Sequence, residues 1–269
     1  MEQYVELPAL HLKDGAKTSE DVPLVVEEPL EIRVNGSPYA VVMRTPGHEM
    51  ELACGFCLTE GIVDSFTDIL SMGFCPDETG EMKNVVQVIV KNAPQEDERS
   101  PGPRALSSMS SCGLCGVRML EDIGRRLFPL EGGPQIKADD LVKMQYEMLK
   151  RQDLFRTTRG GAHAVALADA GGGIIVVRED LGRHNAMDKV IGHAMMNGID
   201  CRRCVALISG RISFEMVQKA VRARIAVVAA ISAATSLAVN LAERMGCTLA
   251  GRLRDRDMVI YTHPSRILT

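Results

Sequence analysis

Short apolar runs and amphipathic segments alternate over residues 162–262, and this pattern limits what the chain can fold into. Apolar residues at 187, 190, 191, 194 and 195 have the spacing of one helical face, which ends at Gly198. Helices are also predicted at 213–224, with Ser213 as N-cap, and at 235–245. Strands are predicted at 162–168, 174–178, 204–209, 225–231, 249–253 and 258–262. Strands separated by helices of this length imply a three-layer α/β domain.

The N-terminal part follows a different plan. Strands at 30–34 and 39–44 flank Asn35–Gly36, a hairpin signal, although the residues up to Tyr39 lengthen the expected loop. A helix is predicted at 47–62 and a strand at 85–90, whereas residues 1–28 lack periodicity and are expected to be extended or poorly ordered. A polar, proline-rich loop at 94–104 precedes helices at 117–128 and 140–155. We therefore expect an α+β protein with an N-terminal α+β domain, 1–110, and an α/β domain, 111–269.

Charge is divided unevenly along the chain. Residues 1–110 carry 8 Lys and Arg against 19 Asp and Glu, whereas residues 111–269 carry 23 against 16, a balance of +7. A basic half suggests an anionic ligand, but subunit packing or simple solvation would also explain it. The absence of Trp argues against aromatic nucleic-acid-binding surfaces. No signal peptide or membrane span is apparent.

Six of the eight cysteines form three C-x-x-C pairs: Cys54/Cys57, Cys112/Cys115 and Cys201/Cys204. Without a secretory signal, thiol chemistry or metal binding is more probable than a disulfide scaffold. Cys112 lies among glycines and serines in SSCGLCG, after the proline-rich loop, so its segment is expected to be mobile. A mobile cysteine suits a carrier that accepts sulfur from one partner and gives it to another.

The cysteines have two alternative interpretations, a zinc site and a thioredoxin-like redox motif. Cys54/Cys57 and Cys112/Cys115 together supply four thiols, the ligand number of a zinc ribbon, but the pairs are far apart in sequence. Cys54 and Cys57 also lie in an apolar helical pattern, where cysteine acts as a small hydrophobic residue. A thioredoxin-like motif should follow a strand rather than a proline-rich loop. We therefore predict no metal site, and structural roles for Cys201 and Cys204.

Polar residues gather where the predicted strands of the C-terminal half end. Such positions favour anions, because the N–H groups at the start of a helix lack partners. Strand-to-helix loops of one α/β domain are expected to emerge at the same edge of the sheet. Plain helix capping is the alternative, but together the loops favour a phosphate-bearing ligand. His163 is interpreted as structural. The candidate residues are Arg183, His184, Asn185, Ser209, Arg211, Arg252, Arg254, Asp255, Arg256 and Asp257.

These segments carry a family resemblance. The chain resembles the formate dehydrogenase accessory sulfurtransferase (FdhD) family from about residue 29 to its end. The matching segments are LEIRVNGSPYAVVMRTPGHEMELACGFCLTEGIV, SSCGLCG, REDLGRHNAMDKVIGHAM, SGRISFEMVQKA, ISAATSLAVNLAERMGCTLAGRL and MVIYTHP.

The resemblance implies specific properties. It implies a cytoplasmic homodimer that takes sulfur from a cysteine desulfurase and sulfurates the molybdenum bis(molybdopterin guanine dinucleotide) cofactor of formate dehydrogenase. It also implies a cytidine-deaminase-like C-terminal domain. The persulfide cysteine of the family corresponds to Cys112, and the guanine dinucleotide stretch corresponds to residues 252–257, which adds Leu253.

The predicted function is therefore a sulfurtransferase with a persulfide on Cys112. Cys115 either helps to release the sulfur or protects the loop as a disulfide. The alternative is a non-catalytic chaperone that binds the molybdenum cofactor and uses its C-x-x-C structurally or for zinc.

Overall fold

The computed structural model describes residues 2–76, 80–91, 127–255 and 257–269. Four predictions fall on the remaining residues: the Cys112/Cys115 loop, the loop at 94–104, most of the helix at 117–128, and Arg256. The division between domains at 110/111 also falls there, so it stays a prediction.

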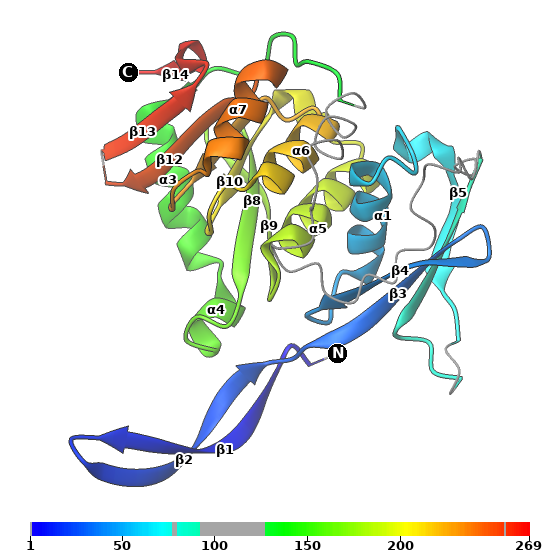
Figure 1. Ribbon diagram of the computed structural model, residues 1–269, viewed down its shortest axis with the longest axis vertical. Coiled ribbons are helices and arrows are strands. Elements are labelled where there is room, and N and C mark those ends of the chain that lie inside the picture. Colours follow the sequence, from blue (N-terminus) through cyan, green and yellow to red (C-terminus); the bar gives the residue numbers. More distant parts are fainter. Residues whose placement is uncertain (1, 77–79, 92–126, 256) are drawn as a thin grey trace.

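A six-stranded mixed sheet forms the centre of the C-terminal half (Figure 1), with the order β13-β12-β11-β10-β8-β9. β10, β11 and β12 are parallel, whereas β8 runs antiparallel to both of its neighbours. The predicted strands are thus confirmed. Their bounds are β8 His163–Asp169, β9 Ile174–Asp180, β10 Cys204–Ile208, β11 Val227–Ala230, β12 Thr248–Arg254 and β13 Asp257–Thr262.

Helices cover both faces of this sheet. On one face, β-strand side chains such as Val165 and Leu167 pack with Met187 and Met216 and form part of the larger core. The helices on that face are α5 Arg183–Met196, α6 Phe214–Arg222 and α7 Ser236–Met245. The opposite face packs on α3 Ala138–Lys150 through Leu141, Met144 and Met148. Strand residues alternate between the two cores, as the pleat requires.

The second sheet belongs to the N-terminal part and has the order β4-β3-β6-β5. β3 Glu28–Val34 and β4 Ser37–Arg44 pair as far as Val34 and Ser37. The hairpin loop is therefore the two residues Asn35–Gly36, and the longer predicted loop is wrong. Both residues have positive φ, which a tight two-residue hairpin requires. β6 Val85–Val90 matches its prediction, whereas β5 Ile69–Phe74 was missed.

Helix α1 Glu49–Thr59 joins the two sheets by packing directly on α5. The backbones approach closely at two glycines: a Cβ at Gly55 would overlap the carbonyl of Asp188, and one at Gly192 would overlap the carbonyl of Glu51. Only glycine permits so close a crossing.

Two buried ion pairs reinforce the same junction. Lys189 Nζ lies 2.8 Å from Asp180 Oδ2, with both side chains fully buried, and Asp180 also accepts from the backbone N–H of Thr45. Lys219 Nζ lies 2.8 Å from Asp188 Oδ2 and donates to Thr59 Oγ1. Because buried charges need partners, these contacts fix the N-terminal part against the six-stranded sheet.

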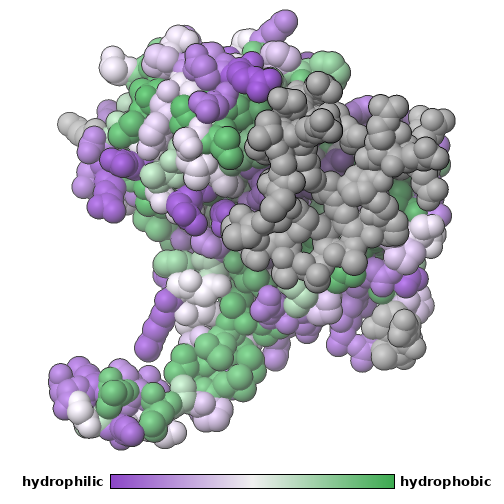
Figure 2. All heavy atoms as spheres, in the orientation of Figure 1, coloured by the Kyte–Doolittle hydropathy of each residue, from purple (hydrophilic) through white to green (hydrophobic). Residues whose placement is uncertain are grey.

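Residues 4–25 form a long antiparallel ribbon that projects from the molecule (Figure 1). Of the two alternatives expected for residues 1–28, the extended one is therefore correct and the poorly ordered one is wrong. β1 Tyr4–Lys13 and β2 Ala16–Val25 turn at Asp14–Gly15, both with positive φ. Figure 2 shows apolar side chains along the ribbon. Leu10 and Leu12 of β1 are more than 60% exposed. Alternation was not visible in the sequence because neither face of the ribbon is buried.

Smaller differences concern the helix predicted at 140–155. It is two helices, α3 and α4 Asp153–Thr157, separated at Arg151–Gln152. The remaining elements are the short strands and one-turn helices β7 Ile136–Lys137, β14 Ile267–Leu268, η1 Phe66–Asp68, η2 Cys201–Arg203 and η3 Pro264–Arg266. No helix in the described part of the chain is both long and apolar enough to span a membrane.

Candidate functional site

The carboxyl ends of β9, β10, β11 and β12 lie at one edge of the six-stranded sheet, because these four strands run in the same direction. We call this the arginine edge, after Arg183, Arg211, Arg252 and Arg254. The loops at its middle are joined: Ile212 N–H donates to Ala233 O, and Thr235 N–H donates to Ile212 O. The edge is thus a connected surface, formed by loops that are distant in the sequence.

Arg183 begins helix α5 in a corner of this edge. Its Nε–H is buried and has no acceptor among the described residues. A Cβ built on Gly210 would lie 3.7 Å from Arg183 Cδ and 3.4 Å from His163 Nδ1, so these three residues meet. No side chain caps the helix, whose N-cap is Gly182. The corner therefore has free hydrogen-bond donors and a positive charge, which suits an anion.

His163 is the residue that the sequence interpretation missed. It begins β8, which runs antiparallel to β10, so the start of β8 lies beside the end of β10. Burial lowers the pKa of His163, and the charge of Arg183 lowers it further. In the sequence, His163 is recognisable only as the start of a predicted strand after Gly160–Gly161. The pairing of β8 is needed to show that His163 faces the arginine edge.

His184, Asn185 and Ser209 already have partners within the protein. His184 Nε2 lies 2.8 Å from Glu215 Oε2, and this hydrogen bond lowers the pKa of Glu215. Asn185 Nδ2 donates to Met43 O and to Asp180 Oδ1, at 2.7 and 3.0 Å. Ser209 Oγ accepts from Ala164 N–H at 2.9 Å. The described contacts of these residues support the loops of the arginine edge.

The predicted dinucleotide stretch lies at the end of β12. Arg252, Arg254, Asp255 and Asp257 are exposed, whereas the Leu253 side chain is fully buried in the core that contains α3. Only the backbone of Leu253 can therefore contact a ligand. Asp255 Oδ1 accepts from Tyr146 Oη at 2.8 Å.

The arginine edge has two positive poles, one at Arg183 and one at Arg252. Arg183 follows β9 and Arg252 lies near the end of β12, so four strand intervals separate them. At about 4.8 Å per interval the poles are roughly 19 Å apart. None of the four arginines forms a side-chain hydrogen bond or ion pair with a described residue. The edge can thus bind an extended ligand with several anionic groups.

Four of the described cysteines, Cys54, Cys57, Cys201 and Cys204, are poor nucleophiles. Cys54 and Cys57 are buried in helix α1, and burial raises the pKa of each to about 12. Burial raises the pKa of Cys201 to about 12 and that of Cys204 to about 11. Because the thiolate is the reactive form, these thiols are inert near neutral pH, as their structural interpretation predicted.

Cys112 and Cys115 lie outside the described residues. Within those residues, no group of three or more His, Cys, Asp or Glu side chains is placed to bind a metal.

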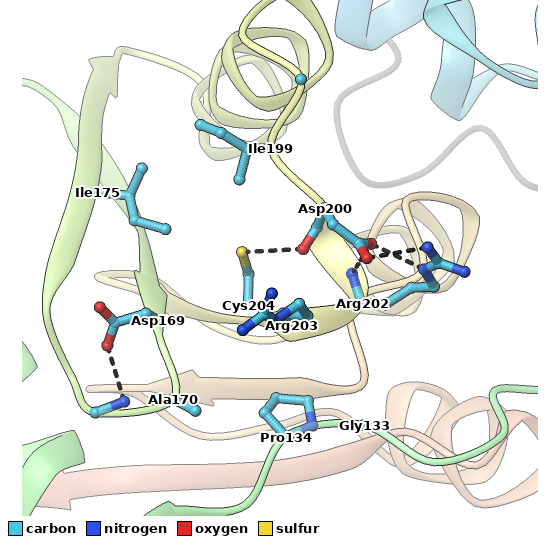
Figure 3. Close-up of a pocket in the computed structure, with 12 residues that line it drawn as sticks. Gly133, Pro134, Asp169, Ala170, Ile175, Ile199, Asp200, Arg202, Arg203 and Cys204 are labelled. Atoms are coloured by element: carbon cyan, nitrogen blue, oxygen red, sulfur yellow. Dashed lines mark hydrogen bonds and ion pairs between the residues drawn. The ribbon is translucent and has the colours of Figure 1, made fainter.

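A hollow of about 910 Å³ lies at the opposite edge of the sheet (Figure 3). Asp169 at the end of β8 and Cys204 at the start of β10 line it, together with Arg203. The Asp200 carboxylate in its wall is paired with Arg202, at 2.8 Å. Asp169 Oδ1 accepts from the backbone N–H groups of Gly171 and Gly173. With a protonated Cys204 and both carboxylates already hydrogen-bonded, the described lining residues offer no thiolate or unpaired carboxylate.

Comparison with known proteins decides the family. The model of the FdhD/NarQ family matches residues 25–268. The chain belongs to the FdhD/NarQ family. A relative from Mycolicibacterium paratuberculosis, called sulfur carrier protein FdhD, is 44% identical over 96% of both chains. A second of the same name, from Streptomyces coelicolor, is 41% identical over 96% of this chain and 93% of its own length.

A solved structure extends the agreement to the fold. The putative formate dehydrogenase accessory protein from Desulfotalea psychrophila superposes with a TM-score of 0.79. The alignment covers 99% of this FdhD-family chain and all of the other, at 23% identity. The mixed α/β architecture is thus shared across the alignment.

Proposed function

We propose that this protein is a sulfur carrier that forms a persulfide on Cys112 and transfers its sulfur to the molybdenum bis(molybdopterin guanine dinucleotide) cofactor of formate dehydrogenase. The observation that carries the proposal is the identity with proteins called sulfur carrier protein FdhD over 96% of the chain. The inert thiols of five cysteines support it: Cys54, Cys57, Cys201, Cys204 and Cys247. They leave Cys75, Cys112 and Cys115 as the better nucleophiles.

In the first transfer the Cys112 thiolate attacks the outer sulfur of a cysteine desulfurase persulfide. The donor's S–S bond breaks and its cysteine leaves as a thiolate, so no net oxidation occurs. Cys112 then carries the sulfur as a persulfide.

The second transfer breaks the S–S bond of the Cys112 persulfide. If Cys115 attacks Cys112 Sγ, the outer sulfur leaves as sulfide and a Cys112–Cys115 disulfide remains, which a cellular thiol must reduce. If the molybdenum centre takes the sulfur directly, Cys112 leaves as a thiolate and a reduced metal centre supplies the two electrons that form the sulfide ligand.

The arginine edge is proposed to bind the nucleotide part of this substrate. A ligand with several phosphates fits the spacing of these arginines, which have no side-chain partners among the described residues, and the buried Arg183 Nε–H. Charge-assisted hydrogen bonds to phosphate would be formed by Arg183, Arg211, Arg252 and Arg254. In this proposal, the bound cofactor is the substrate, and its guanines and phosphates orient the molybdenum centre toward Cys112.

The test is the intact mass of the protein after incubation with a desulfurase and cysteine. Wild type should gain one sulfur atom that a reductant removes, and Cys112→Ala should gain none. Cys75→Ala is the matched control, because Cys75 is a partly exposed thiol in the described part of the chain. A Cys112→Ala protein that gains sulfur as wild type does would contradict the proposal and leave the non-catalytic chaperone as the better description.

A further inference from the structure

The side chains of His163 and Arg183 both lie beside Gly210 at the corner of the arginine edge. They form no hydrogen bond with each other. The His163 ring and the Arg183 side chain both pack beside Gly210, within 3.4 and 3.7 Å of a Cβ built there. Neither side chain hydrogen-bonds to a described residue, and Arg183 Nε is buried. An acceptor placed here could receive hydrogen bonds from both.

Burial lowers the pKa of the His163 ring in the free protein, and the neighbouring positive charges lower it further. Arg183 and His184 on α5 oppose a positive imidazole, while Asp180 on β9 favours it. Asp180 is already paired with Lys189, and Glu215 on α6 is paired with His184. Among the described residues, no unpaired negative charge therefore lies beside His163 to stabilise its protonated form.

We propose that His163, Arg183 and Gly210 form a phosphate subsite in which the His163 imidazole takes up a proton from solution as the phosphate binds. The inference rests on the proposed function, since it assigns the phosphate end of that ligand to this corner. A phosphate group supplies up to two negative charges, which favour the imidazolium and satisfy the Arg183 Nε–H.

Proton uptake by His163 predicts the direction in which ligand affinity changes with pH. Binding raises the pKa of His163, so the extra affinity is present at low pH and is lost as pH rises through the pKa of the bound form. Between about pH 6 and about pH 8 the affinity of wild type should therefore fall as pH rises. The second ionisation of phosphate, near pH 6, works in the opposite direction and is shared by every variant.

The experiment is calorimetric titration of the full chain with GDP and, separately, with pyrophosphate. Each titration is repeated in two buffers of different ionisation enthalpy, which reports the protons taken up. Wild type should take up part of one proton per ligand near pH 7. His163→Gln should take up far less of a proton per ligand. It should also lose most of the fall in affinity that wild type shows between about pH 6 and about pH 8.

The control for a change away from the corner is Arg203→Ala. Arg203 is an exposed arginine at the opposite edge of the sheet, so this variant removes a positive charge without touching the corner. It should behave as wild type. NMR titration of the His163 ring in wild type, with and without pyrophosphate, measures the pKa directly and needs no variant.

The outcomes separate this inference from the proposed function. Pyrophosphate binding with proton uptake by His163 supports the subsite, even if GDP does not bind and the nucleotide assignment fails. GDP binding without proton uptake, with an unchanged pKa of His163, overturns the subsite and leaves the nucleotide proposal intact. Binding of neither ligand overturns both.

Discussion

At the scale of the residue, burial divides the cysteines into two groups. Cys54, Cys57 and Cys247 have pKa values raised to about 12 because their thiolates would be desolvated. We expect that iodoacetamide at about pH 8 modifies Cys75 but leaves these three unmodified, since only about one in ten thousand of them is a thiolate. Peptide mass spectrometry checks this. Native-state modification of Cys54 at the rate of Cys75 would contradict the inert assignment.

The arginines can be tested singly because they are separated across the sheet. Arg183→Ala and Arg254→Ala should each weaken GDP binding about tenfold or more, since a desolvated charge-assisted hydrogen bond contributes roughly 1.5–3 kcal/mol. Calorimetry measures the change, with Arg203→Ala as the control. Equal GDP affinity in all of these proteins would place the nucleotide elsewhere.

The sequence predicted which polar residues lie at the arginine edge but not their contacts. Arg183 and His184 were found because they follow a predicted strand. The partners of Asn185 and Ser209 could not be predicted, since Met43 and Ala164 reach them only through tertiary packing. His163 was missed because its position depends on β8 running against β10.

At the scale of the element, the contact between α1 and α5 is the most restrictive in the fold. Gly55→Ala should lower the free energy of unfolding by about 2 kcal/mol or more, because its Cβ meets the backbone of Asp188 rather than a movable side chain. Gly73→Ala, in open space, should stay within about 1 kcal/mol of wild type. Urea unfolding measures both. A Gly55→Ala protein as stable as Gly73→Ala would show that the helices can separate easily.

The elements of the C-terminal half were largely predictable because each strand and helix has a distinct apolar period. The N-terminal ribbon and β5 were not. Both are strands without a fully buried face, so their side chains show little alternation between apolar and polar residues. The break between α3 and α4 was hidden because apolar residues continue across it at helical spacing.

At the scale of the whole molecule, charge is the feature most relevant to the proposed ligand. Residues 111–269 have a balance of +7, although the chain has a net charge of −4. GDP affinity should fall several-fold between about 0.05 M and about 0.5 M salt, because the attraction is partly long-range and is screened. Calorimetry over this range tests the expectation. Affinity that does not change with salt would indicate that arginine–phosphate contacts contribute little to binding.

The most direct test of the central claim follows sulfur from a desulfurase to formate dehydrogenase. Labelled cysteine, a desulfurase, this protein and inactive formate dehydrogenase are combined, and both labelled protein sulfur and formate oxidation are measured. The sulfur-carrier account predicts that Cys112→Ala takes up no labelled sulfur and activates no enzyme, while it still binds GDP with wild-type affinity. Cys115→Ala should retain more activity. Full activation of formate dehydrogenase by Cys112→Ala would contradict the account.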